Sequence, residues 1–312
     1  MKKILVFLLF DLLICTSCTT GDEVNSINYS FFADNGVNHQ SIAAYGDYAL
    51  FVTDRRSKFS LYNLKTKEIL CEKELGGVNE MIGKYVLYHC NQTTFGVSFY
   101  EDEDPFPLLY ISQRARSDGR SFVEVYRLKL GRETSESDFS SLDAEKVQTI
   151  FFPAMTENNA LGRVNCVIDN QTGELYTYSY SIVDTDINYR KCRISCFAIP
   201  NNKEKEVYLE DNDILDSYIL DYDAVNSQGA CISNRMLFIG QGYFSAGYIF
   251  LNVIDLMQKR LVNRINFLTN GITWEPEGCF VYGNSILIGS GNNIWEFPIK
   301  EVLVDKTNST SN

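Results

Sequence analysis

A unit of four short strands, separated by tight turns, recurs along this chain of 312 residues. The clearest copy has its strands at residues 41–45, 48–52, 59–64 and 68–75. A second close copy has them at residues 229–232, 236–239, 248–256 and 261–267. A repeated unit of this size cannot bury its apolar residues alone and packs against its neighbours, so the repeat constrains the fold more than any single motif does. The abundance of Tyr, Phe, Val and Ile favours strands throughout.

Five such units are expected, and they begin near His39, His89, Gly162, Ser227 and Glu275. The last unit has only three strands, at residues 278–282, 285–289 and 294–299, whereas an unassigned strand at residues 27–33 precedes the first unit. Pairing this N-terminal strand with the last unit would complete four strands and close a ring, which leaves only short, protected edges. We therefore predict an all-β fold, a five-bladed β-propeller of four-stranded antiparallel sheets, as a single domain over residues 29–300.

Two other architectures fit parts of the pattern. A sixth blade would arise if the long third unit, residues 162–226, contained an additional irregular one. A two-sheet sandwich also has many short strands, but it explains the repeated first residues of the units less well.

The N-terminus resembles an export signal. Lys2 and Lys3 precede an apolar run at residues 4–14 that is too short to cross a bilayer. Residues 15–18, Cys-Thr-Ser-Cys, resemble a bacterial lipobox, so we expect residues 1–18 to be removed as a lipoprotein signal peptide and Cys18 to carry lipid. An ordinary secretory signal is the alternative. Residues 19–28 would be a tether, and residues 301–312 would be a disordered tail. The expected location of the protein is the cell envelope, at the periplasmic or surface face of the outer membrane.

Charge and cysteine content narrow the partners. The net charge of −12 argues against nucleic acid, whose phosphate backbone needs a basic surface. Of nine cysteines, Cys15 and Cys18 belong to the signal, and the odd number that remains leaves the disulfide state open. Cys231 and Cys279 occupy matching positions of their units, as small buried fillers. Cys192 and Cys196 lie too far apart on one strand to pair.

Polar residues recur where the innermost strand of each unit begins, and the only two histidines of the chain are among them. In a propeller these starts converge on one mouth of the central channel. The candidate ligand-binding residues of this central funnel are His39, Gln40, His89, Asn91, Arg163, Gln228, Trp274, Glu275 and Glu277. Three interpretations stay open: structural lining in which the polar groups satisfy one another, a ligand pocket, and a metal or catalytic site.

A ligand pocket would bind a glycan or another envelope component, with Trp274 or Tyr243 stacking on an apolar sugar face. If a divalent metal is bound, His39, His89 and Glu277 are its expected ligands. The rival hypothesis is a hydrolase or lyase that uses the two histidines with Glu275 or Glu277. No residue has the setting of a catalytic nucleophile, so we assign none and leave enzymatic activity open. We expect a monomer that touches the membrane only through its lipid.

The starts of the units resemble those of uncharacterised Bacteroidetes lipoproteins of the TolB-like propeller type. The resemblance rests on His39-Gln-Ser41, Tyr45-Gly-Asp-Tyr48, His89-Cys-Asn91, Phe95-Gly96, Leu108-Leu-Tyr-Ile-Ser112 and Glu275-Pro-Glu-Gly278. More remotely, the chain is similar to teichoic-acid biosynthesis protein C, helveticin-type proteins and staphylococcal phage receptor-binding propellers. The resemblance implies a propeller fold. Gln92 stands where the remote relatives usually have an acid, and fold does not by itself transfer activity.

Overall fold

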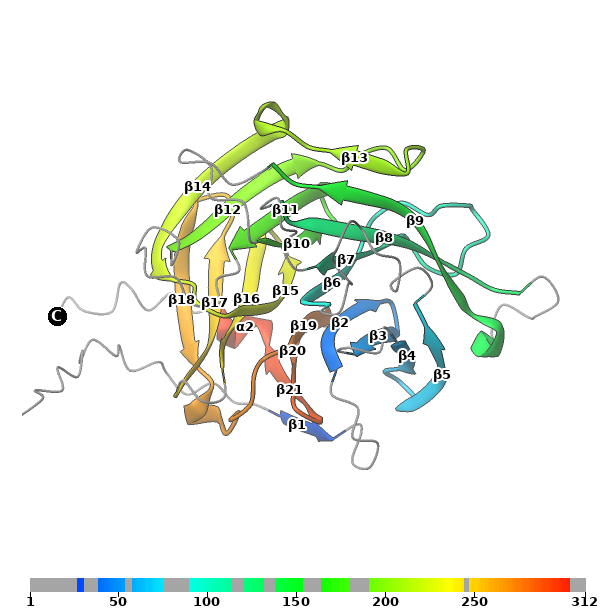
Figure 1. Cartoon of the computed structure of the whole chain (residues 1–312). Helices are drawn as coiled ribbons and strands as arrows, with labels where there is room; N and C mark the ends of the chain where they lie inside the picture. The colour runs from blue at the N-terminus through cyan, green and yellow to red at the C-terminus, as the bar shows by residue number, and fades with distance from the viewer. Residues whose placement is uncertain are drawn as a thin grey trace, which may run out of the picture.

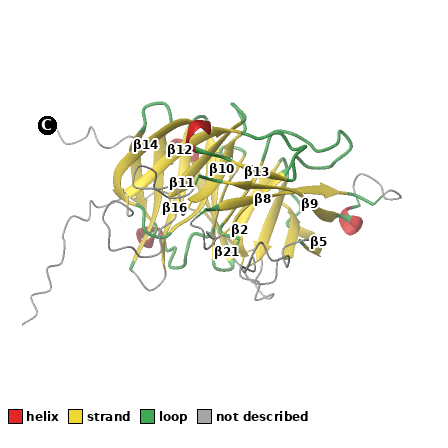
Figure 2. Ribbon diagram, turned by 45° about the horizontal axis from the view of Figure 1, so that its top comes forward, coloured by secondary structure: helices red, strands yellow, loops and turns green. Residues whose placement is uncertain are grey.

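The strands of the chain form five separate sheets around a common axis (Figure 1). The computed structural model describes residues 27–30, 39–53, 58–75, 90–113, 120–131, 138–153, 164–179, 191–243 and 247–303. Within these ranges the fold is nearly all β (Figure 2), and the predicted five-bladed propeller is confirmed. The helices in these ranges are short, and none is long and apolar enough to cross a bilayer.

Each blade is an antiparallel sheet whose strands follow one another from the axis outward. Blade 1 contains β2 (His39–Tyr45), β3 (Tyr48–Thr53), β4 (Lys58–Asn63) and β5 (Glu68–Glu74). Blade 2 contains β6 (Gln92–Phe95), β7 (Leu109–Gln113), β8 (Phe122–Lys129) and β9 (Asp143–Phe151). Blade 3 contains β10 (Val164–Asp169), β11 (Glu174–Ser179), β12 (Lys191–Ala198) and β14 (Ile214–Asp223). Blade 4 contains β15 (Ser227–Ser233), β16 (Met236–Tyr243), β17 (Tyr248–Asp255) and β18 (Arg260–Asn266).

Blade 5 is built from both ends of the described chain. Its inner strands are β19 (Gly278–Tyr282), β20 (Ser285–Ser290) and β21 (Asn293–Pro298), and its outer strand is β1 (Ile27–Ser30). β1 pairs antiparallel with β21, in a register that places Ile27 opposite Glu296 and Ser30 opposite Asn293. The predicted closure by the N-terminal strand is therefore confirmed. The short helix α2 (Ile299–Val302) follows β21, and Val302 is buried against blades 4 and 5.

The six-bladed alternative is wrong, because the described residues of the long third unit form one four-stranded sheet and one additional strand. This strand, β13 (Glu206–Tyr208), lies between β12 and β14 in sequence but pairs parallel with β9 of blade 2. Tyr208 stacks on Phe151, with ring centroids 4.5 Å apart. The insertion therefore joins two neighbouring blades and does not form a new one.

The hydrophobic core is divided among the five interfaces between neighbouring blades. One cluster of buried residues lies at each interface, from blades 1 and 2 around to blades 5 and 1. Alternation along an inner strand distributes its side chains: Ile42 of β2 packs toward blade 5, whereas Ala43 packs toward blade 2.

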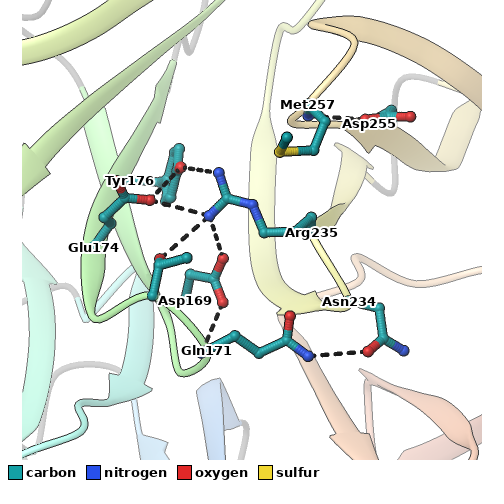
Figure 3. A network of polar contacts seen from close by, with 9 residues as sticks. Asp169, Gln171, Glu174, Tyr176, Asn234, Arg235, Asp255 and Met257 are labelled. Atoms are coloured by element: carbon teal, nitrogen blue, oxygen red, sulfur yellow. Dashed lines mark hydrogen bonds and ion pairs between the residues drawn. The ribbon is translucent and has the colours of Figure 1, made fainter.

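A polar clamp joins blades 3 and 4 at one end of the ring (Figure 3). Arg235, in the turn between β15 and β16, donates from Nη1 to Asp169 at 2.6 Å and to Glu174 at 3.0 Å. Its Nη2 donates to the hydroxyl of Tyr176 at 2.8 Å. Because Asp169 is 1% exposed, its carboxylate depends on this guanidinium for a counter-charge. The clamp is a structural contact at the end of the axis opposite the strand starts.

Candidate functional site

The five inner strands lie next to one another around the axis, and described residues from the starts of three of them come into contact. The strands β2, β6, β10, β15 and β19 contact one another in turn around the ring (Figure 1). Polar contacts between residues far apart in sequence connect three of these starts. Gln40 of blade 1 donates from Nε2 to Oε2 of Glu277 at 2.5 Å, and Gln228 of blade 4 donates to Oε2 of Glu275 at 3.1 Å.

These two Gln–Glu pairs place two carboxylates at the mouth. The two glutamines, Gln40 and Gln228, are buried, whereas Glu275 and Glu277 are half-buried. Each glutamate therefore accepts a hydrogen bond from a buried side chain and is itself partly exposed to solvent. The backbone of Gln228 is held by blade 3, because the hydroxyl of Tyr178 donates to the backbone carbonyl of Gln228 at 2.6 Å. Burial raises the pKa of Tyr178 well above its usual value, so the hydroxyl stays protonated and remains a donor.

The segment that carries the carboxylates is pinned to blades 4 and 5. The amide of Gly229 donates to the carbonyl of Pro276 at 3.3 Å, and Ser290 Oγ donates to the carbonyl of Trp274 at 2.8 Å. Pro276 lies so close to β16 that a Cβ on Gly240 would stand 2.8 Å from the proline carbonyl oxygen. Only glycine fits at this position without displacing the segment.

Two exposed aromatic side chains accompany the carboxylates. Trp274 precedes Glu275 and is 55% exposed, with one edge against Gly291 of the β20–β21 turn. Tyr243 ends β16, which pairs with the first strand of blade 4, and it is 48% exposed. Large exposed aromatics next to hydrogen-bonding carboxylates are the combination that holds the apolar face and the hydroxyl groups of a sugar.

His39 lies away from solvent, between blades 5 and 1. It is 4% exposed, its ring meets Phe51 edge-on at 5.5 Å, and a Cβ on Gly289 would stand 2.7 Å from its Nε2. Neither ring nitrogen has a hydrogen-bond partner among the described residues. Burial lowers the pKa of His39 to about 4, so the imidazole is neutral at pH 7. Its surroundings are those of a packing residue.

The other expected site residues have different outcomes. Asn91 is buried, with 1% of its surface exposed, at the start of blade 2. His89, Arg163 and Cys18 lie outside the described residues. In the parts of the chain that the structure describes, no three His, Cys, Asp or Glu side chains cluster as metal ligands would. The structure therefore brings together Gln40, Gln228, Glu275 and Glu277, with Trp274 beside them.

Gln92 is a residue of the channel that the sequence did not assign to the site. Its side-chain amide reaches from blade 2 to blade 4, where Nε2 donates to the carbonyl of Ala230 at 2.7 Å and Oε1 accepts from the amide of Ala230 at 2.9 Å. A carboxylate at this position could accept but not donate. The amide at position 92 therefore matches a contact between blades that an acid cannot make when ionised.

The opposite end of the axis contains a small cavity of about 90 Å³, which all five inner strands line. Its lining includes Ile42–Ala44, Thr93–Phe95, Cys231 and Cys279. This volume holds only a few water molecules. The mouth at the strand starts, with its carboxylates and exposed aromatics, is therefore the stronger candidate site.

Comparisons with known proteins leave the function of this chain open. No family model matches the chain, and no curated protein matches its sequence. Among solved structures, the glutaminyl cyclase of Myxococcus xanthus is 10% identical with a TM-score of 0.47, over 89% of this chain and 95% of that one. A Bacteroides caccae protein of unknown function is 12% identical (TM-score 0.38; 82% and 71%), and a luciferin-regenerating enzyme is 10% identical (TM-score 0.41; 91% and 80%). Similarities this low carry no argument about activity.

Proposed function

We propose that this propeller is a binding protein that recognises a glycan of the cell envelope at the mouth where its inner strands begin. The observation that carries the proposal is the pair of half-buried carboxylates, Glu275 and Glu277, each fixed by a buried glutamine and flanked by exposed Trp274. Fixed carboxylates accept hydrogen bonds from sugar hydroxyls without first losing conformational freedom. The indole face supplies the apolar contact.

Residues 1–18 support a location for this activity. The lipobox-like Cys15-Thr-Ser-Cys18 would place a diacyl lipid on Cys18 and hold the propeller at the outer membrane, next to envelope glycans. Metabolic labelling with a fatty-acid probe is expected to mark the wild-type protein and not the Cys18→Ala variant. Equal labelling of the two proteins would contradict the anchor and leave the binding proposal untouched.

Binding is tested first on an array of envelope polysaccharides and their oligosaccharide fragments. Affinity for the best probe is then measured by titrating tryptophan fluorescence in a Trp295→Phe background, so that Trp274 is the only reporter. We expect Glu277→Gln to weaken binding about tenfold or more, because it removes a charged acceptor while its amide oxygen still accepts from Gln40. Trp274→Ala, followed by calorimetry, is expected to weaken binding by a similar factor.

The matched control is Tyr208→Ala, which removes an exposed aromatic residue of β13, the strand that pairs with the outer edge of blade 2 and is separated from the axis by β9, β8, β7 and β6. It is expected to leave the affinity unchanged. Retention of full affinity by both mouth variants, or an array on which no polysaccharide binds, would overturn the proposal.

A further inference from the structure

Two cysteines from neighbouring blades meet beside the channel. Cys231 of β15 and Cys279 of β19 are both buried, and their Sγ atoms are 3.0 Å apart. The bond of a disulfide is about 2.05 Å long, so a movement of about 1 Å would join them. The two residues are 48 positions apart in sequence and occupy matching places in their blades.

The backbones around the pair approach each other closely. A Cβ placed on Gly229 would stand 2.6 Å from the carbonyl oxygen of Glu277 and 2.7 Å from Cα of Gly278. Gly229 lies two residues before Cys231, and Gly278 lies one residue before Cys279. These two glycines therefore let β15 and β19 approach each other next to the cysteines. A disulfide typically joins Cα atoms 4.4–6.8 Å apart, so the strands that carry its two cysteines must lie close together.

We propose that Cys231 and Cys279 form a disulfide that ties blade 4 to blade 5. The oxidant is a second disulfide, either a small one such as glutathione disulfide or that of a dithiol oxidase. One cysteine attacks the oxidant to give a mixed disulfide and release one thiol, and the other cysteine attacks the mixed disulfide and releases the second. One S–S bond forms and one breaks, and the two protons and two electrons of the cysteine thiols end on the two released thiols.

The surroundings of the pair indicate when this exchange takes place. Burial, together with the neighbouring thiol of Cys279, raises the pKa of Cys231 well above its usual value, and the thiolate is the form that attacks. The cavity beside the pair, of about 90 Å³, is too small to admit glutathione disulfide. Oxidation therefore precedes the docking of blade 5 onto blade 4, and the finished bond is shielded from reductants.

The proposed disulfide joins blade 4 to blade 5, the blade in which the ring closes. Blade 5 is the blade that β1 completes, so it is held to the rest of the chain by a strand pairing as well as by packing. A covalent bond to blade 4 restricts the unfolded chain over a loop of about 50 residues, which favours the folded state. This role is independent of the ligand that binds at the mouth.

The experiment uses the full-length chain, unfolded with reductant and refolded in detergent with a glutathione redox buffer. Free thiols are then alkylated under denaturing conditions, and peptides are analysed by mass spectrometry. We expect a peptide pair linked through Cys231 and Cys279, which ten times more reductant does not release until denaturant is added. Alkylation of both cysteines in the refolded wild type would overturn the proposal, whatever the variants do.

Stability measurements separate the bond from simple packing. The melting temperature of oxidised wild type is expected to exceed that of the reduced protein by on the order of 5 °C or more. This difference should vanish in Cys231→Ala and in Cys279→Ala, because each variant lacks one of the two thiols. Alanine is a suitable replacement, since blade 1 has Ala43 at the matching position. Cys192→Ala, which removes a buried cysteine of blade 3, should keep the difference. Loss of the difference in this control as well would contradict the assignment.

Discussion

At the scale of single residues, this molecule separates polar groups that are alike in sequence. Gln40 and His39 are neighbours at the start of β2, yet Gln40 reaches the carboxylate of Glu277, whereas His39 packs between blades 5 and 1. The pairing of β2 with β3 shifts register between His39 and Ser41, so strict alternation is interrupted there, and both side chains turn toward blade 5. His39, one of the expected metal ligands, is therefore a buried residue whose imidazole is neutral at pH 7.

The burial of His39 predicts a pH dependence of stability. The pKa of this imidazole is about 4 in the folded protein and about 6.5 in an unfolded chain, so between these values only the unfolded state takes up the proton. The contribution of His39 is complete above pH 6.5 and is lost progressively as the pH falls to 4. The free energy of unfolding is expected to decrease by about 3 kcal/mol over this interval on account of His39.

Urea unfolding at several pH values checks this prediction. His39→Leu should flatten the decrease relative to wild type, and a two-dimensional NMR titration should show the His39 ring protonating near pH 4. Because the chain has only two histidines, a His89 variant assigns the signals. A His39 ring that titrates near pH 6.5 would show that it is solvated.

At the scale of elements, the closure of the ring depends on a strand of four residues. β1 pairs with β21 from Ile27 to Ser30, and it covers an edge that would otherwise expose unpaired backbone groups. Its position could be predicted because blade 5 lacks a strand and the N-terminus has one to spare. β13 could not be predicted in this way, since its partner β9 belongs to another unit and its three residues carry too little pattern.

Two truncations test the closing strand. Deleting residues 1–25 leaves β1 intact and is expected to give a folded protein with an unchanged melting temperature. Deleting residues 1–34 removes β1 and is expected to lower the melting temperature by on the order of 5 °C or to cause aggregation through the open edge of β21. Differential scanning calorimetry and light scattering measure both effects. Identical melting of the two truncations would mean that β1 contributes nothing to the ring.

At the scale of the whole molecule, contacts across the axis connect blades that are not neighbours. Gln92 of blade 2 exchanges two hydrogen bonds with Ala230 of blade 4, 138 residues away in sequence. Because the Gln92 side chain is buried, its amide has no water with which to replace these bonds. The Gln92 side chain therefore spans the axis from blade 2 to blade 4.

Substitutions of Gln92 are expected to be costly in a way that depends on pH. Gln92→Leu should lower the free energy of unfolding by about 1–3 kcal/mol, because the buried amide and carbonyl of Ala230 lose their partners. Gln92→Glu should cost more at pH 7, since an ionised carboxylate cannot donate to the Ala230 carbonyl. The folded-state pKa of this glutamate would be raised, so its penalty relative to wild type should shrink as the pH falls and the carboxyl becomes a donor.

The measurement is urea unfolding of wild type and both variants, compared at equal pH so that the effect of His39 cancels. Gln92→Asn is the control that keeps the amide but shortens its reach. A glutamate variant whose penalty does not change with pH would contradict the role given to the two hydrogen bonds.

The strand rhythm, the five units and the closing strand could all be predicted from the amino-acid sequence. These follow from alternation, turn residues and the count of strands, which are properties of neighbours along the chain. The sequence also indicated that the unit starts would share a mouth, and the contacts of Gln40 with Glu277 and of Gln228 with Glu275 agree with this. The repeat is regular enough that its geometry could be anticipated without coordinates.

The sequence does not indicate which of these polar residues face the mouth, which face a neighbouring blade, and which thiols meet; these depend on the packing of the blades. Gln40 and Glu277 are 237 residues apart, and Cys231 and Cys279 are 48 apart, so no local pattern encodes their distances. Those distances depend on how each inner strand is rotated about its own axis and on how closely two glycines let β15 and β19 approach. Rotation and approach are set by packing against both neighbours at once, which exists only when the ring is complete.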